Sequence, residues 1–182
     1  MTTWTDLRKA LNELPPEKLV ELLKGLHDLS PQNKAWLQAQ VLPVGQDTGY
    51  LEDCRQKIIK LVYNPARKFP DMPRFRDAKK IISDYKTATK DLWGTLDLML
   101  TYVERGHAFT NDFGDIDGPF YDKLINMLDH FAIELKKSPA RRELYDRFRP
   151  RLLKMNRTAD IGWGYGDFVH DTVVELEELL GN

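Results

Sequence analysis

Apolar residues recur along this chain every three or four positions, which is the spacing of amphipathic α-helices, and no convincing strand alternation is found. The first helical face carries four large apolar side chains: Trp4, Leu7, Leu11 and Leu14. Thr3 precedes this face as a predicted N-cap, with Asp6 three residues later. Similar apolar helical faces recur along the rest of the sequence. The pattern therefore predicts an all-α protein with eight or nine helices.

One predicted helix, over residues 92–103, is apolar on nearly every side. Such a helix is typical of the buried centre of a bundle. We expect Trp93 and Leu96 on this helix to be buried, and we expect Gly106 to end it as a C-terminal stop.

Residues that cap or break helices predict several other boundaries. Ser30 and Ser138, each followed by proline, are predicted N-caps, and so is Asp167. Pro150 is expected to kink or break the helix in which it lies, because proline lacks a backbone N–H.

Residues 43–49 are rich in turn formers and are predicted to be a linker. The linker separates a leucine-rich helical hairpin region, residues 1–44, from a main helical bundle, residues 49–182. We expect the hairpin region to pack on the bundle or to hinge against it, and the two regions to form one structural unit overall.

Composition excludes several classes of protein. The 182 residues include 27 basic and 28 acidic side chains, and this balance excludes a strongly basic nucleic-acid domain but not a local patch. No apolar run approaches the roughly 18 residues of a membrane helix, and the N-terminus lacks a secretion-signal pattern. The single cysteine cannot form an internal disulfide, so a cytoplasmic location with no membrane partner is expected.

Charge is distributed in blocks of alternating sign. Residues 136–157 carry a net charge of +7 and residues 158–182 carry −6. We expect these neighbouring blocks to pair, through Arg141, Arg142 or Arg149 on one side and Glu175, Glu177 or Glu178 on the other. The alternative is that a basic block, at residues 67–90, is an exposed patch for RNA, DNA or an acidic protein surface.

A basic segment with interleaved aromatic residues, NPARKFPDMPRFRDAKK, spans residues 64–80. Cations bind phosphates and aromatic rings stack on bases, so this composition suits nucleic acid. Six residues are candidates for binding: Arg67, Lys68, Arg74, Arg76, Lys79 and Lys80. The alternative is a solvated loop that Phe69 and Phe75 anchor to the bundle.

An acidic, turn-rich segment, FTNDFGDIDGPFYD, spans residues 109–122. Asp112, Asp115 and Asp117 are weak candidates for binding a hard cation such as calcium or magnesium, although their spacing does not fit an EF-hand. The alternative is that these carboxylates cap backbone amides, with Asp117 at the start of the next helix.

Glycines alternate with aromatic residues in IGWGYGDFVH, residues 161–170. No strand precedes this segment and no Lys or Arg lies within it, so it does not match a nucleotide-binding loop. Trp163 and Tyr165 could form a platform for a peptide or a ligand. The alternative is that both fill grooves in the core while the glycines allow close backbone packing.

Catalytic motifs are scarce. Cys54 lies on an apolar helical seam and is expected to be a buried thiol. The four histidines include no HExxH motif, and no paired-cysteine zinc pattern is present. The remaining option is a composite site of His107, His130 and His170 with Asp112 or Asp171. No cofactor is predicted, and a metal-dependent enzyme ranks third among the functions considered.

The chain resembles a bacterial family that is catalogued only as a domain of unknown function. The resemblance lies in the opening, LRKALNELPPEKLVELLKGLHDLSPQNKAWLQ, and in three later stretches: YVERGHAFTNDFGDIDGPFYD, RFRPRLLKM and IGWGYGD. It spans most of the chain and implies a bacterial, soluble, single-domain helical protein. It assigns a catalytic role to no residue, because the family has no known activity, cofactor or ligand.

These observations predict a non-enzymatic protein-interaction or adaptor module with an unidentified protein partner. The alternative is a nucleic-acid-associated protein that binds through the basic patch at residues 67–80.

Overall fold

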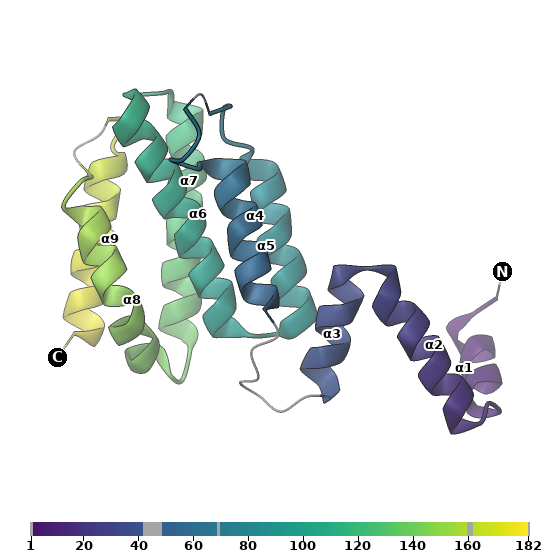
Figure 1. Cartoon of the computed structure of the whole chain (residues 1–182). Helices are drawn as coiled ribbons and strands as arrows, with labels where there is room; N and C mark the ends of the chain where they lie inside the picture. Colours follow the sequence, from purple (N-terminus) through teal and green to yellow (C-terminus); the bar gives the residue numbers. More distant parts are fainter. Residues whose placement is uncertain (1, 42–48, 69, 160–161, 182) are drawn as a thin grey trace. The chain divides into compact units, whose positions relative to one another are not determined.

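The computed structural model describes residues 2–41, 49–68, 70–159 and 162–181. Within these ranges all nine regular elements are α-helices, so the predicted all-α class is confirmed (Figure 1). The chain divides into two compact units, Met1–Thr48 and Gly49–Asn182. The predicted linker lies outside the described residues, apart from Gly49.

The first unit contains three helices: α1 (Trp4–Asn12), α2 (Pro16–Leu29) and α3 (Pro31–Val41). The predicted cap of α1 is confirmed, because Thr3 and Asp6 form a reciprocal capping box. Ser30 caps α3, and its Oγ accepts a hydrogen bond from the backbone N–H of Asn33 at 3.1 Å. Helix α2 packs on α3. None of the described side chains in residues 2–41 is buried.

The second unit is a bundle of six described helices: α4 (Tyr50–Val62), α5 (Phe75–Thr89), α6 (Leu92–Phe113), α7 (Gly118–Lys137), α8 (Arg141–Asn156) and α9 (Tyr165–Leu180). Helix α6 contacts α4, α5, α7 and α8, and every residue from Gly94 to Val103 is buried. The prediction of a buried central helix is therefore confirmed. Leu96 is fully buried, but Trp93 is only half-buried, with its ring stacked on Phe148 at 6.5 Å.

The prediction that Gly106 ends the central helix is wrong, since α6 continues to Phe113. Gly106 lies at the contact with α7. A Cβ atom added there would come within 2.4 Å of Leu124 Cδ2, so the glycine allows the two helices to approach closely. Gly114, with φ at +89°, ends the helix instead, and its N–H donates to the carbonyl of Thr110.

Three further boundary predictions are corrected by backbone geometry. Helix α8 begins at Arg141, and the Oγ of Ser138 accepts from the N–H of Ala140 in the turn before it, so Ser138 is not the N-cap. Asp167 lies inside the first turn of α9, after an N-cap at Gly164. Pro150 does not break α8, which runs on to Asn156 because its apolar face is buried in the bundle.

The two charge blocks pair as expected at one point. Arg149 on α8 contacts Glu177 on α9 with Nη2 2.5 Å from Oε1, and the Tyr145 hydroxyl donates to the same carboxylate. These bonds lower the pKa of Glu177 to about 2. Glu175 contacts Lys136 of α7 at 2.7 Å instead. Both cations belong to the basic block, but Lys136 lies on α7 and is not one of the three arginines expected to form these pairs.

A second charged cluster ties three helices together. Asp97 on α6 is 5% exposed and binds Arg55 of α4 and Arg151 of α8, at 2.7 and 2.6 Å. Arg151 also binds Glu104, about two turns further along α6, at 2.7 Å. The central helix is thus joined to α4 and α8 by charge as well as by apolar packing.

Candidate functional site

The three segments that the sequence analysis selected meet at one end of the bundle, which we call the loop end. Residues 63–74 join α4 to α5 there, residues 114–117 join α6 to α7, and residues 157–164 join α8 to α9 (Figure 1). The connections at the opposite end, residues 90–91 and 138–140, are shorter. Binding residues are concentrated on loops that a rigid scaffold positions, so the loop end is the candidate site.

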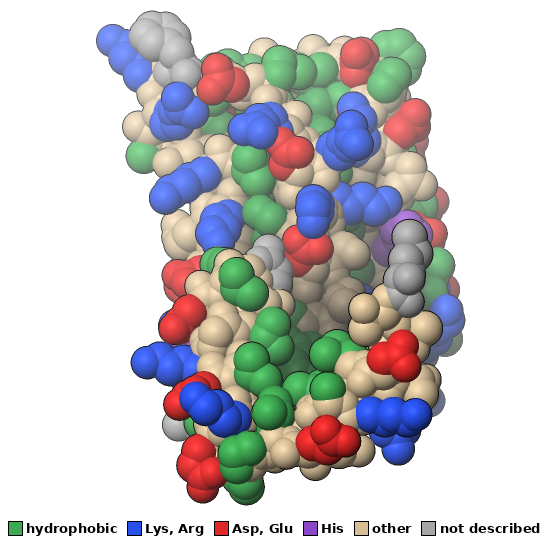
Figure 2. All heavy atoms as spheres, turned by 90° about the vertical axis from the view of Figure 1, so that its right-hand side faces the viewer, with side chains coloured by type: hydrophobic (Ala, Val, Ile, Leu, Met, Phe, Trp, Pro, Cys, Tyr) green, Lys and Arg blue, Asp and Glu red, His purple; other side chains and the backbone are tan. Residues whose placement is uncertain are grey.

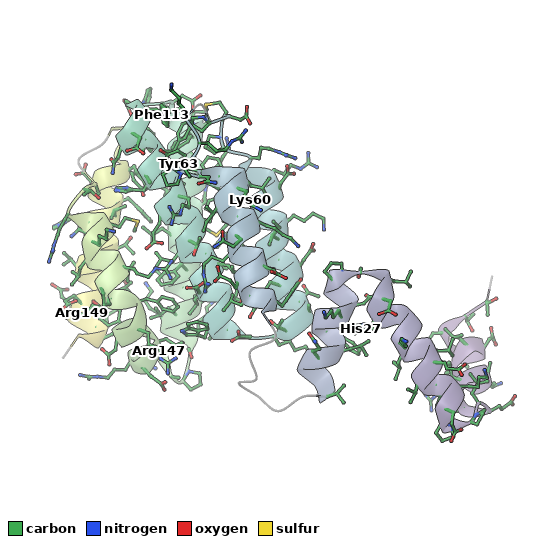
Figure 3. All side chains as sticks on the ribbon, viewed as in Figure 1. His27, Lys60, Tyr63, Phe113, Arg147 and Arg149 are labelled. Carbon is green, nitrogen blue, oxygen red and sulfur yellow. The ribbon has the colours of Figure 1, made fainter. Side chains whose placement is uncertain are left out.

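Tyr63 joins the first two of these segments. Its hydroxyl donates a hydrogen bond to Asp112 at the end of α6. Its ring stands edge-on to Phe113, with centroids 5.9 Å apart, and Figure 3 shows both rings at the loop end. Tyr63 is not recognisable as a site residue from sequence, because a tyrosine just after a helix carries no signal of a partner 49 residues away.

The second and third segments also touch. The hydroxyl of Tyr121 donates to Asp115 at 2.6 Å, and a Cβ atom on Gly162 would come within 2.8 Å of the same carboxylate. A Cβ atom on Gly118 would lie 3.5 Å from the indole of Trp163. The acidic and the aromatic-glycine segments therefore pack against each other where glycine leaves room.

The two aromatic candidates of the third segment have different environments. Tyr165 is fully buried, and its hydroxyl lies 3.2 Å from Nδ1 of His107. Trp163 is 64% exposed and adopts a φ of +59°, which is rare for a bulky residue. Tyr165 thus packs in the core, as the alternative interpretation expected, and Trp163 alone is accessible.

His107 is held inside the bundle. Its Nε2 lies 2.8 Å from Oγ1 of Thr158, while Nδ1 meets Tyr165. Burial lowers the pKa of His107 to about 4, so the imidazole is neutral near pH 7. Both ring nitrogens have protein partners, and the ring serves to join α6 to the segment before α9.

The three acidic candidates each accept a hydrogen bond from the protein. Asp112 accepts from Tyr63, Asp115 from Tyr121, and Asp117 from the backbone N–H of Phe120 at 2.9 Å. Asp117 is thereby the N-cap of α7, as expected. In the described part of the chain, no group of three or more His, Cys, Asp or Glu residues could hold a metal ion.

Two of the six basic candidates, Arg67 and Arg74, line a small pocket, and three others, Arg76, Lys79 and Lys80, lie on α5. Ten residues line the pocket: Lys60, Leu61, Val62, Tyr63, Asn64, Arg67, Pro70, Asp71, Met72 and Arg74. Its volume of about 100 Å³ is below the roughly 300 Å³ at which ligand pockets begin. It suits a single side chain or anionic group rather than a nucleotide.

Carboxylates on the same segment offset part of this basic charge. Arg67 pairs with Asp71 at 3.4 Å, Arg74 with Asp77 at 2.5 Å, and Lys80 with Asp84 at 2.8 Å. The side chains of Lys68, Arg76 and Lys79 are exposed, and Phe69 lies outside the described residues. Figure 2 shows Lys and Arg side chains interspersed with Asp and Glu in its upper half.

Three large apolar side chains are exposed at the loop end, one from each segment. Met72 is 60% exposed, Phe113 51% and Trp163 64%. Aromatic residues, Met and Arg are enriched in protein interfaces. We call the following set the loop-end surface: Lys60, Arg67, Met72, Arg74, Phe113 and Trp163.

Comparison with known proteins gives no further guidance. No family model matches the chain, and neither a curated protein nor a solved structure matches it. The resemblance to a bacterial family of unknown function therefore stays a prediction. Among the described helices, none combines the length and the apolar character needed to cross a bilayer.

Proposed function

We propose that this protein is a non-enzymatic protein-interaction module whose partner binds the loop-end surface. The observation that carries the proposal is the pocket lined by Lys60, Arg67, Arg74 and the exposed Met72, at the same end of the bundle where Phe113 and Trp163 are also exposed. Large apolar side chains that are exposed together mark interaction sites, and arginines beside aromatic residues are common among residues that dominate binding energy.

The chemistry of this surface defines the partner. The pocket is lined by three cations and one carboxylate, Asp71, and has room for one acidic side chain. Trp163 and Phe113 offer flat apolar area at low entropic cost. The fitting partner is a protein segment that places an Asp or Glu near apolar residues.

Nucleic acid is supported less well. Three of the six basic candidates are paired with carboxylates at i+3 or i+4, Arg67 and Arg74 of the pocket among them. Nucleic acid needs several cations along its phosphates, whereas one acidic side chain needs only one or two. Trp163 and Phe113 lie outside the basic segment, and Phe75, which lies within it, is buried and so is not available to stack on a base. Binding of single-stranded RNA at low salt would favour this alternative.

An enzyme is supported least. The two groups with most potential as nucleophile or base, Cys54 and His107, are 2% and 5% exposed. Burial raises the pKa of the Cys54 thiol, which disfavours its nucleophilic thiolate near neutral pH, and both ring nitrogens of His107 are engaged by Thr158 and Tyr165.

Site-specific photocrosslinking tests the proposal. A photoreactive amino acid in place of Met72 should give a discrete protein adduct in a cell extract, and one in place of Leu179, exposed on α9, should not. The adduct should disappear when Arg67 and Arg74 are both changed to Glu. It should persist when Arg76 and Lys79, which are exposed but do not line the pocket, are changed to Glu. Equal crosslinking at both positions, or an adduct that nuclease removes, would contradict the proposal.

A further inference from the structure

The helices of the first unit present an apolar seam that their own unit does not cover. On α1 and just beyond it, apolar residues recur at spacings of three, four and three; on α2 the same spacings recur at Leu19, Leu22, Leu26 and Leu29. Seven large side chains on or beside these seams are between 36% and 74% exposed: Trp4, Leu7, Leu14, Leu22, Leu23, Leu26 and Leu29. Hydrophobic side chains of these helices gather in the lower half of Figure 2.

Helices as short as α1 and α2 are stable only when their apolar faces pack against a partner. Isolated helices under about 12–15 residues are marginal in water, and helices gain most of their stability by packing an apolar face. Helices α1 and α2 have 9 and 14 residues, and none of their side chains is buried. A partner that buries the apolar faces of α1 and α2 would therefore stabilise this unit.

The spacing of the seam indicates what covers it. Apolar residues that alternate by three and four positions fit helices crossing at about 20°, as in coiled coils and four-helix bundles. The fitting occupant is another set of helices with the same repeat. This unit of the chain itself supplies such helices.

Charge and area are compatible with self-association. Residues 1–45 contain five basic and five acidic side chains, so two copies do not repel each other over long range. If each residue buries on the order of 100 Å², less than the roughly 150–250 Å² of a fully buried aromatic side chain, the seven would bury on the order of 700 Å² per copy. Stable interfaces bury about 800 Å² per partner.

We propose that the N-terminal unit of a second copy of this chain covers the seam of α1 and α2, so that the protein is a homodimer joined by its N-terminal helices. The proposal goes beyond the interaction function proposed above, because it uses no residue of the loop-end surface. Dimerisation would present two loop-end surfaces on one particle and raise the apparent affinity for a partner with two sites.

The molecular mass of the full chain in solution tests this proposal. Light scattering after size-exclusion chromatography should give twice the chain mass of 21.2 kDa. The double change Leu22→Lys and Leu26→Lys should halve that mass. Val20→Lys is the matched control: Val20 is 63% exposed on the same helix but lies off the seam, so this variant should remain a dimer.

Crosslinking keeps the proposal testable if the lysine variants fail to fold. A flexible bismaleimide should join two copies of a Leu22→Cys chain but not two copies of a Leu179→Cys chain. A single species of 21.2 kDa at every accessible concentration would overturn the dimer. A dimer that persists in the double lysine variant would also overturn it. Photocrosslinking from Met72 could still succeed in either case, so the two proposals fail separately.

Discussion

Buried polar side chains at single positions determine much of how this bundle responds to pH and substitution. His107 is the strongest case, because the folded state holds it neutral between Thr158 and Tyr165. Its pKa falls from 6.5 to about 4 on burial. In the unfolded chain the same ring binds a proton near pH 6.5, so the two states differ in bound protons across this interval.

Stability should therefore fall as the pH drops through this interval. Above pH 6.5 the ring is neutral in both states; between 6.5 and about 4 only the unfolded state is protonated, so acid favours unfolding. We expect a loss of about 1.4 kcal/mol between pH 7.5 and pH 5.5, one unit below the ordinary pKa. Urea unfolding at the two pH values measures it. His107→Gln should be less stable at pH 7.5 but should show a much smaller change with pH.

Leu96 provides a prediction about packing alone. It is fully buried in α6, and truncating a buried leucine leaves a cavity that the surrounding structure fills only in part. Leu96→Ala should lower the free energy of unfolding by about 2–5 kcal/mol, measured by urea denaturation. A loss below about 1 kcal/mol would place α6 at the surface.

At the scale of elements, apolar periodicity predicted the presence of the helices far better than their ends. A repeat of 3.6 residues persists along a whole helix, whereas an end depends on one or two residues whose roles are ambiguous. Gly106 shows the ambiguity: a glycine after an apolar run can end a helix or allow close contact with a neighbour. Only the position of Leu124, which sequence spacing does not give, distinguishes the two.

Substitution of Gly106 tests whether this glycine is needed for the close contact between α6 and α7. Gly106→Ala should destabilise the bundle by about 1–3 kcal/mol, because the added methyl group overpacks the contact with Leu124 in a fully buried site. Gly25→Ala is the control. Gly25 lies inside α2 with nothing within 4 Å, so alanine should raise helix content there. Circular dichroism and thermal denaturation report both effects.

The ion pairs of Asp97, which join α6 to α4 and α8, allow a further prediction about stability. Asp97→Asn would leave Arg55 and Arg151 without their shared carboxylate in a largely buried site, where removing one partner of an ion pair costs about 3–5 kcal/mol. The exposed pair of Glu143 and Arg147 serves as the comparison, and Glu143→Gln should cost less than about 1 kcal/mol. Similar losses for both variants would show that the Asp97 cluster is solvated.

At the scale of the whole molecule, the sequence indicated three segments of interest but not that they meet. Each was selected from its own composition. Their meeting at the loop end follows from how successive helices alternate in direction, and contacts such as Tyr63 with Asp112 join residues far apart in sequence. The pairing of opposite charge blocks was predictable, since neighbouring helices α8 and α9 carry opposite signs. The use of Lys136 from α7 was not.

Charge pairing across helices makes the stability of the bundle sensitive to salt. Three exposed or half-exposed pairs join different helices: Lys86 with Glu134, Lys136 with Glu175, and Arg149 with Glu177. Ions screen such pairs, and each exposed pair contributes little to the free energy of unfolding. The melting temperature should fall between about 0.05 M and about 0.5 M sodium chloride. Arg149→Gln should reduce that dependence, and an unchanged slope would show that this pair contributes nothing.

The six described helices of the bundle alternate in direction, so the chain enters and leaves the bundle at the same end. This determines where a label or a surface can be attached without blocking the loop-end surface. The chain enters at Gly49 and leaves after Leu180, and both points lie at the end opposite the loop end (Figure 1). A fluorophore, a bead or a sensor surface joined beyond Leu180 would therefore hold the bundle by its base and leave Met72, Phe113 and Trp163 facing the medium. Such an immobilised protein should retain its full capacity for a partner, whereas coupling through a cysteine introduced at Met72 should abolish it.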